Sequence, residues 1–97
     1  FWQLRYPEAG GARPVTHEEA AAGVRQRLTQ AVEKRLMSDV PLGAFLSGGL
    51  DSTIIVGLMS RMLAAPVKTF SIGFEGDAAY DETAYARLAA ERFKTKP

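Results

Sequence analysis

The sequence contains no cysteine and a single histidine, His17. Without cysteine it has no disulfide, no zinc knuckle and no thiol nucleophile, so any bound metal would be held mainly by oxygen atoms. It also has no apolar run approaching the roughly 20 residues that span a membrane. A charge excess is missing too, because 12 lysines and arginines face 11 aspartates and glutamates. This balance provides neither a basic surface for nucleic acid nor an acidic tail.

What the sequence does contain is typical of one modest globular domain. Its 97 residues are 46% hydrophobic and 24% charged, which argues against a disordered or fibrous chain. The chain starts with Phe1 rather than methionine and stops at Pro97, directly after a helical pattern. We therefore expect it to be a piece of a longer protein. His17 would lie in the first turn of a helix, and we assign it no role.

Residues 1–15 are expected to connect this domain to another part of the protein. An apolar-rich stub at residues 1–6 is followed by residues that break regular structure, namely Pro7, Gly10, Gly11 and Pro14. The stub is compatible with a flexible arm or an edge strand. We favour a linker in which residues 1–6 are the last strand of an upstream domain.

The spacing of apolar residues from position 16 onward predicts the order helix, strand, helix, strand, helix. The first helix should cover about residues 17–37, because Thr16 and Glu19 form a capping-box pattern. An apolar residue also recurs at every fourth position of this segment, at Ala20, Val24, Leu28, Val32 and Leu36. Residues 42–46 are apolar without alternation, which is typical of a strand buried on both faces of a parallel sheet.

The second helix is expected to begin near Ser52 and to end before Pro66. Its apolar residues fit helical spacing better than strand spacing, and they are Ile54, Ile55, Leu58, Met59, Met62 and Leu63. Gly57 inside this helix costs about 1 kcal/mol relative to alanine. Close packing against the sheet would explain the glycine, and a tolerated accident is the alternative.

Residues 67–74 are expected to form the second strand, with Phe70, Ile72 and Phe74 on one face. A loop should follow at residues 75–80, and Asp81 should cap the third helix. The apolar face of that helix is expected to carry Tyr85, Leu88, Ala89 and Phe93. Two buried strands joined by a helix form a βαβ unit, which is almost always parallel and right-handed.

Residues 47–52 carry the chemistry, and they are Ser47, Gly48, Gly49, Leu50, Asp51 and Ser52. They lie between the first strand and the second helix, at the carboxyl end of the strand, where α/β sheets bind ligands. Glycine lets the backbone adopt positive φ and approach a ligand, so that successive N–H groups form an anion nest. The helix N-terminus and the two serine hydroxyls add donors. This arrangement favours a phosphate or pyrophosphate.

Asp51 fits an anion site only if a cation lies between its carboxylate and the phosphates. Mg²⁺ is commonly held by one or two carboxylates plus substrate phosphates, so Asp51 is the candidate Mg²⁺ ligand. The plainer interpretation is that Asp51 caps the helix and the glycines only form the turn. Other nucleotide loops do not fit, because the sequence has no complete P-loop and no Gly-x-Gly-x-x-Gly motif.

Residues 47–52 resemble the pyrophosphate loop of the N-type ATP pyrophosphatases, which include asparagine, argininosuccinate, GMP and NAD synthetases and tRNA-thiolating enzymes. The flanks are more specific and resemble glutamine-hydrolysing asparagine synthetase. They read RLMSDVPLGAFL at residues 35–46, TFSIGF at residues 69–74 and YDE at residues 80–82. The resemblance covers residues 16–97. It implies an α/β fold with a three-layer parallel sheet, the adenine nucleotide alpha-hydrolase-like fold, of which these residues form the N-terminal part.

The resemblance implies that ATP and Mg²⁺ activate the side-chain carboxylate of aspartate. Ammonia from a glutaminase domain, located upstream of the linker at residues 1–15, then forms the amide. The loop would bind pyrophosphate and Asp51 would bind Mg²⁺. Leu46 and Ile72 would flank the adenosine, although their side chains are also compatible with the core. The nucleotide site would then consist of Leu46, Ser47, Gly48, Gly49, Leu50, Asp51, Ser52 and Ile72.

Capping and solvation explain the acidic cluster of Asp77, Asp81 and Glu82, and a supporting role at the Mg²⁺ site stays open. The family's glutaminase nucleophile is an N-terminal cysteine, which this chain lacks. Other segments of the site should lie beyond Pro97, so we expect the chain alone to be inactive. The resemblance also implies a cytoplasmic protein without nucleic-acid or membrane partners, and it allows a homodimer.

Two alternatives to asparagine synthesis stay open. One is a relative that adenylates another carboxylate, such as a β-lactam-forming synthetase or an amidotransferase for a cell-surface polymer. The other is a non-catalytic nucleotide-binding or regulatory module that keeps the loop without turnover.

Overall fold

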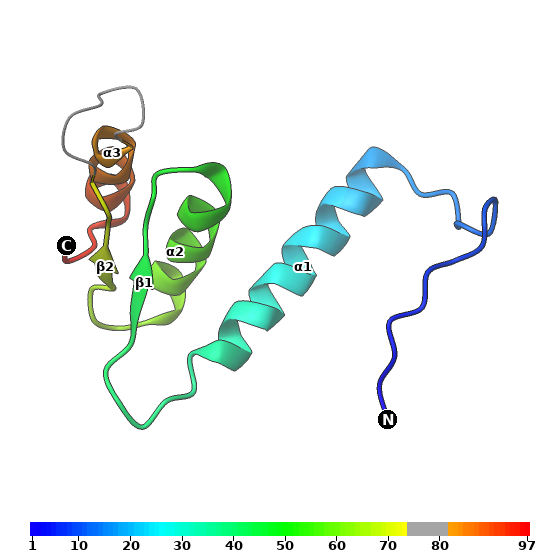
Figure 1. Cartoon of the computed structure of the whole chain (residues 1–97), viewed down its shortest axis with the longest axis horizontal. Helices are drawn as coiled ribbons and strands as arrows, with labels where there is room; N and C mark the ends of the chain where they lie inside the picture. The colour runs from blue at the N-terminus through cyan, green and yellow to red at the C-terminus, as the bar shows by residue number, and fades with distance from the viewer. Residues whose placement is uncertain (74–81) are drawn as a thin grey trace.

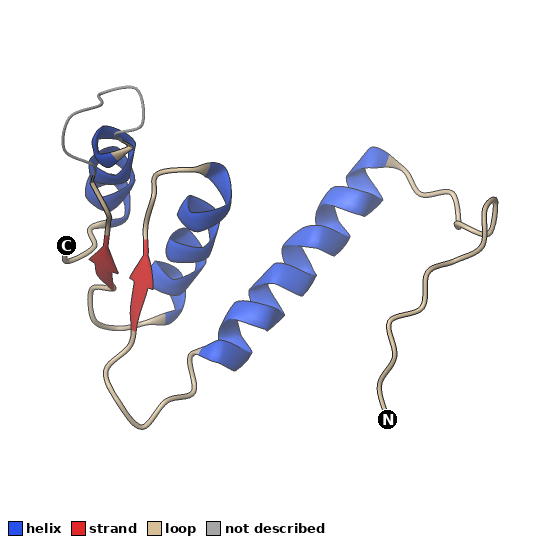
Figure 2. Ribbon diagram, in the orientation of Figure 1, coloured by secondary structure: helices blue, strands red, loops and turns tan. Residues whose placement is uncertain are grey.

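The computed structural model describes residues 1–73 and 82–97 and has the predicted order of elements (Figures 1 and 2). The elements are α1 (His17–Arg35), β1 (Gly43–Phe45), α2 (Leu50–Met62), β2 (Lys68–Phe70) and α3 (Thr83–Phe93). Residues 1–15 contain neither helix nor strand, so the strand considered for residues 1–6 is not formed. None of the helices in the described residues is long and apolar enough to cross a membrane.

β1 and β2 run parallel and are shorter than the strands expected from the sequence. Their register pairs Phe45 with Phe70. On the opposite edge of β2, the N–H of Lys96 donates to the carbonyl of Val67 at 2.8 Å, and the N–H of Thr69 donates to the carbonyl of Lys96 at 2.9 Å. β2 therefore has parallel backbone on both sides. The expected α/β class with a parallel βαβ unit is confirmed.

The helices cover one face of this sheet, and the other face is open in the described residues. Ala44 of β1 packs into the core, whereas Phe45 is 76% exposed and Phe70 is 57% exposed. The two phenylalanine rings lie side by side on the open face, with their centroids 6.4 Å apart. The expectation that residues 42–46 are buried on both faces is therefore wrong for this structure, because the described helices supply only one of the two outer layers.

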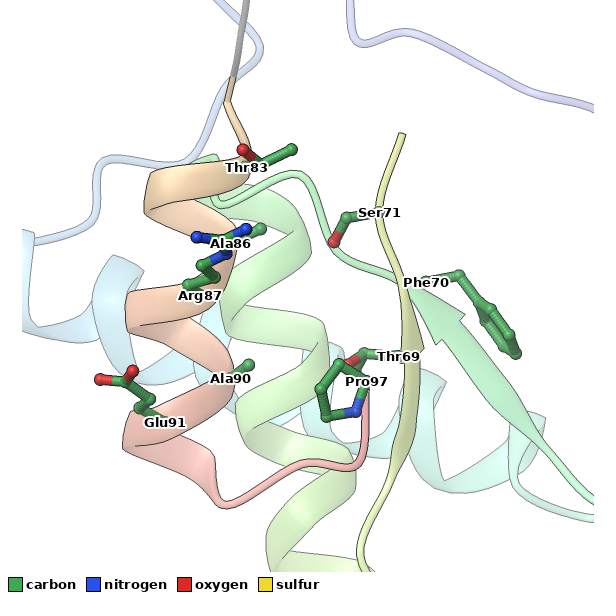
Figure 3. A pocket seen from close by; sticks show the side chains of 9 residues that line it. All are labelled: Thr69, Phe70, Ser71, Thr83, Ala86, Arg87, Ala90, Glu91 and Pro97. Carbon is green, nitrogen blue, oxygen red and sulfur yellow. The ribbon is translucent and has the colours of Figure 1, made fainter. Parts of the chain in front are cut away.

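The residues expected on one face of this second strand lie, where they are described, on its open face. Val67 and Thr69 are buried, whereas Phe70 and Ile72 are exposed, and Phe74 lies outside the described residues. Figure 3 shows Phe70 pointing away from α3. Successive side chains of a strand point to opposite faces. The smaller residues of this segment therefore lie on the face that the helices cover, and the larger ones lie on the open face.

α2 lies between α1 and α3 and contributes to two core clusters. One contains Leu46, Val56, Ala86 and Ala89, and the other contains Val32, Met59 and Val67. Val56 is completely buried although it was not in the expected apolar set, and Ile54 of that set is exposed. A helix with neighbours on two sides buries more than one stripe, so the spacing of large apolar residues alone does not define its buried face. The helix ends at Met62, four residues before Pro66.

α3 buries its small residues rather than its large ones. Tyr85 is 65% exposed and Leu88 is 64% exposed, whereas Ala86 and Ala89 are buried. The expected face of α3 is therefore wrong at two of its four positions. The N-cap of α3 is Glu82, whose side chain makes no capping hydrogen bond. The expected cap, Asp81, lies outside the described residues.

α1 begins where the sequence predicts, but only part of its predicted apolar stripe is buried. Its C-terminal half packs on the core through Val32, while Val24 is exposed. There the stripe borders an open groove of about 750 Å³ between α1 and α2. The helix ends at Arg35, two residues earlier than expected.

The capping box at the start of α1 gives a first testable prediction. The N–H of Glu19 donates to the Thr16 hydroxyl and the N–H of Thr16 donates to the Glu19 carboxylate, both at 3.1 Å. Thr16→Ala removes one of these bonds and should lower the free energy of unfolding by about 1 kcal/mol, measured by urea denaturation. Thr29→Ala is the matched control, because the Thr29 hydroxyl donates only to Arg25 within the helix. Since alanine is the better helix former, an equal loss in the control would contradict the prediction.

Gly57 is explained by α3 and not by the sheet, which corrects the sequence interpretation. A Cβ atom at this position would lie 2.8 Å from the ring of Phe93. Gly57→Ala should therefore lower the free energy of unfolding by about 1–2 kcal/mol, because overpacking outweighs the gain in helix propensity. Phe93→Leu should cost stability by itself but remove the penalty of Gly57→Ala. A double-mutant cycle measured by urea denaturation tests this coupling, and additive effects would contradict it.

Candidate functional site

Leu46, the residue before the loop, is fixed by its side chain and by both backbone polar groups. Its side chain is 1% exposed and belongs to the core. Its N–H donates to the carbonyl of Phe70 at 2.8 Å, and its carbonyl accepts a 2.6 Å hydrogen bond from the hydroxyl of Ser71. Of the two interpretations of Leu46, the core role of the side chain is thus observed. Only its backbone lies at the carboxyl edge of the sheet.

Two serine hydroxyls bracket the loop. The hydroxyls of Ser47 and Ser52 lie 3.0 Å apart, and the hydroxyl of Ser52 donates to the carbonyl of Gly49 at 3.2 Å. Because a hydroxyl has one proton, Ser47 must then be the donor in the serine pair. The hydroxyl of Ser47 also accepts the N–H of Gly49 at 3.2 Å. Both hydroxyl protons are engaged within the loop, so binding an anion through them requires a rotation of each hydroxyl.

Gly48 is the residue at which the loop requires glycine. Its φ is +86°, in the left-handed region that side-chain-bearing residues avoid. A Cβ atom there would lie 2.5 Å from the backbone N of Ala86 and 2.5 Å from the carbonyl carbon of Tyr85. The loop backbone therefore rests directly on the first turn of α3. Gly49 differs, because its φ is −67° and a Cβ atom would approach only the Ser47 hydroxyl, at 3.3 Å.

α2 begins two residues earlier than expected, at Leu50, with Gly49 as its N-cap. The first intrahelical bond runs from the N–H of Thr53 to the carbonyl of Gly49. The three N–H groups before Thr53, at positions 50–52, have no intrahelical acceptor and carry the positive end of the helix dipole. The interpretation of Asp51 as the helix cap is therefore wrong, because Asp51 lies in the first turn.

The acidic residues that the structure describes do not form a metal site by themselves. Asp51 is exposed, and the described part of the chain holds no group of three or more histidine, aspartate or glutamate residues that could bind a metal. One exposed carboxylate beside a loop with free N–H groups fits a cation whose other ligands would be phosphate oxygens. Of the acidic cluster considered above, Glu82 is the N-cap of α3, while Asp77 and Asp81 lie outside the described residues.

A cleft of about 510 Å³ lies between β2 and α3, next to the loop (Figure 3). Ser71 and Ala86 line it, and each also has a contact with residues 46–48. Sequence reasoning missed both residues as parts of the site. The sequence analysis placed Ser71 inside the expected strand at residues 67–74, and its position after the end of β2 is visible only in the structure. The sequence contained no signal for Ala86, because its role depends on the approach of α3. Ile72, expected beside the adenosine, is 69% exposed after the end of β2.

Most of the chain matches one family of known proteins. A family model described as asparagine synthase matches residues 23–97, which include both strands, α2, α3 and the loop between β1 and α2. The chain belongs to the asparagine synthase family. An asparagine synthetase [glutamine-hydrolyzing] 2 of Methanocaldococcus jannaschii, so named with the qualifier putative, is 51% identical over 73 residues. That match covers 74% of this chain and 14% of the relative.

Other relatives of this asparagine synthase family member carry two kinds of name. The asparagine synthetase [glutamine-hydrolyzing] 1 of Bacillus subtilis is 43% identical over 65 residues, covering 65% of this chain and 10% of the relative. The amidase chyE of Penicillium rubens is 35% identical over 103 aligned positions, covering 93% of this chain and 15% of the relative. The chain thus spans only about one seventh of the length of the Methanocaldococcus jannaschii relative.

Proposed function

We propose that the polypeptide carrying these residues adenylates a carboxylate with ATP and then converts it to an amide. A carboxylate oxygen attacks the α-phosphorus of ATP, and the bond to the β-phosphate oxygen breaks, releasing pyrophosphate. Ammonia then attacks the acyl carbon, and AMP leaves with the bonding electron pair. The observation that carries this proposal is the loop at residues 47–52, whose backbone joins the carboxyl end of β1 to the N-terminus of α2, where no side chain makes a capping bond.

The donors of this loop suit the pyrophosphate end of the nucleotide. Three N–H groups at positions 50–52 lack intrahelical acceptors, and the hydroxyls of Ser47 and Ser52 can turn toward an anion. Fixed donors at the place where the leaving group gains charge stabilise the transition state more than the ground state. We assign pyrophosphate binding to residues 47–50 and 52. We assign the adenosine to the backbone of Leu46 and to Ile72, which follow β1 and β2 at the same edge of the sheet.

Asp51 would hold Mg²⁺ at this loop, together with phosphate oxygens. When bound, Mg²⁺ neutralises charge on the phosphates and on the departing pyrophosphate. Asp51 is exposed and therefore accessible to a cation that arrives with the nucleotide. Without such a cation its carboxylate would repel the phosphates. The donor chemistry thus favours binding of ATP as its Mg²⁺ complex.

The names of the relatives favour aspartate as the acceptor carboxylate and glutamine as the source of ammonia. The chain has no cysteine, so we assign glutamine hydrolysis to a part of the protein outside these 97 residues. A second candidate is the amidation of a different carboxylate by the same adenylation chemistry. It is favoured by the amidase relative of Penicillium rubens, whose similarity covers 93% of this chain.

The test is exchange of labelled pyrophosphate into ATP by the complete natural polypeptide that contains these residues. The assay uses Mg²⁺ and a panel of carboxylic acids that includes aspartate. Exchange that requires aspartate supports asparagine synthesis, and exchange with another acid alone supports the second candidate. Binding of ATP without exchange on any acid would contradict both and favour a non-catalytic nucleotide-binding module.

A further inference from the structure

The hydroxyl of Ser71 takes the place of a backbone N–H donor at the point where the sheet ends. β1 and β2 pair through Phe45 and Phe70, and the N–H of Leu46 still donates to the carbonyl of Phe70. In a regular parallel ladder the carbonyl of Leu46 would next accept the N–H of Ile72. It accepts the hydroxyl of Ser71 instead, at 2.6 Å. A side chain therefore continues the pairing beyond the last ladder residue.

This hydrogen bond acts on the first peptide group of the loop. The carbonyl of Leu46 belongs to the same rigid plane as the N–H of Ser47. Fixing the carbonyl therefore fixes the direction in which the N–H of Ser47 points and the position of its Cα atom. The hydroxyl of Ser47 in turn meets Ser52 at 3.0 Å and accepts the N–H of Gly49 at 3.2 Å. The hydrogen bond of Ser71 thus also affects the orientation of the donor groups of the loop.

We propose that Ser71 is a positioning residue for the anion-binding loop, an inference that rests on the proposed adenylation. Ser71 touches the loop only through the carbonyl of Leu46, and its hydroxyl proton is used in that bond. It is therefore not a catalytic residue. Its effect is to hold residues 46–47 so that the hydroxyls and N–H groups of the loop keep one arrangement. Misplacement of such groups by about 1 Å can lower a rate on the order of 100-fold.

The kinetic test compares Ser71→Ala, Ser71→Thr and a control in the complete natural polypeptide. Ser71→Ala should lower kcat for pyrophosphate exchange by roughly 10- to 100-fold, with a smaller change in KM for ATP, because misaligned donors fail mainly in the transition state. Ser71→Thr keeps the hydroxyl and should restore most of the rate. Ser38→Ala is the matched control. The hydroxyl of Ser38 also bonds to backbone, at Val40, and Ser38 has no hydrogen bond to the loop among the described residues.

The thermal unfolding midpoint separates positioning from a structural role. Ser71 is exposed and Ser71→Ala loses a single part-buried hydrogen bond, so the midpoint should fall only slightly below that of the wild type. Unchanged kcat in Ser71→Ala would overturn the inference. So would an equal loss of kcat in Ser38→Ala, or a failure of Ser71→Thr to restore the rate.

A second measurement does not depend on activity. Ser71→Ala should speed hydrogen–deuterium exchange of the backbone amides at residues 47–50, relative to wild type and to Ser38→Ala. Unaltered hydrogen–deuterium exchange at these amides would overturn the positioning role even if the enzyme assay detected no activity. If the wild-type polypeptide shows no pyrophosphate exchange on any acid while the amide result holds, the proposed function fails and the positioning of the loop by Ser71 stands.

Discussion

Replacing Gly48 by alanine is expected to separate the loop from α3 and to destabilise the fold strongly. The φ of +86° places the new side chain in a disfavoured region, which costs about 1–3 kcal/mol. Its Cβ atom would also lie 2.5 Å from backbone atoms of Tyr85 and Ala86. Backbone cannot move aside as a flexible side chain can, and overpacking of this kind costs a further 1–3 kcal/mol or so. We expect the free energy of unfolding to fall by about 3 kcal/mol or more.

Urea denaturation of the Gly48→Ala polypeptide measures this loss, and pyrophosphate exchange measures the accompanying loss of function. Gly49→Ala is the matched control one residue away. The φ of Gly49 is −67°, and its Cβ atom would meet only the Ser47 hydroxyl, at 3.3 Å. The control should therefore lower the free energy of unfolding by only about 1 kcal/mol, because alanine replaces glycine at an N-cap. If both variants lost the same stability, the contact between Gly48 and α3 would not be the cause.

The contrast between Gly48 and Gly49 illustrates what the sequence could predict. The loop was recognised because its residue types and its place between a strand and a helix are local properties. The capping box of Thr16 and Glu19 was predicted for the same reason, since its two partners are three residues apart. Local pattern also gave the order of the five elements. It did not show which of the two glycines cannot carry a side chain. That steric constraint comes from α3, more than 30 residues further along the chain.

The errors in the predicted buried faces have a related cause. On α3, the large residues Tyr85 and Leu88 point outward and Ala86 faces the loop. Hydrophobic spacing gives weight to large side chains, but where a helix approaches backbone closely only small side chains fit. On β2, the face that meets the helices holds Val67 and Thr69 while Phe70 stays exposed. Which face of a strand is covered depends on the crossover helices, so alternation alone leaves two choices.

The position of Asp51 in the first turn of α2 gives its charge one small structural role. In the first turn of a helix, a carboxylate stabilises the helix by about 0.3–1 kcal/mol. Asp51 makes no capping bond, since the N-cap is Gly49. A carboxylate beside donors that suit an anion lowers the affinity of the loop for phosphate unless a cation is present. The Mg²⁺ proposed above would remove this repulsion between the carboxylate and the phosphates.

Asp51→Asn should therefore abolish most of the activity with little change in the fold. The variant keeps the shape of the side chain and removes its charge. We expect pyrophosphate exchange to fall about 100-fold or more, which corresponds to at least about 2.7 kcal/mol of transition-state stabilisation. The Mg²⁺ concentration that gives half-maximal exchange should rise. The unfolding free energy should fall by less than about 1 kcal/mol, because only the interaction with the helix dipole is lost.

Asp39→Asn is the control for the charge itself. Asp39 is also exposed and lies four residues before β1, outside the loop. The control should keep both the wild-type exchange rate and the wild-type Mg²⁺ dependence. If Asp51→Asn did the same, Asp51 would not be the metal ligand. If both variants lost activity to the same degree, a general effect of net charge on nucleotide binding would replace the specific role of Asp51. A loss confined to Asp51→Asn and partly reversed by high Mg²⁺ is the result that the geometry of this loop predicts.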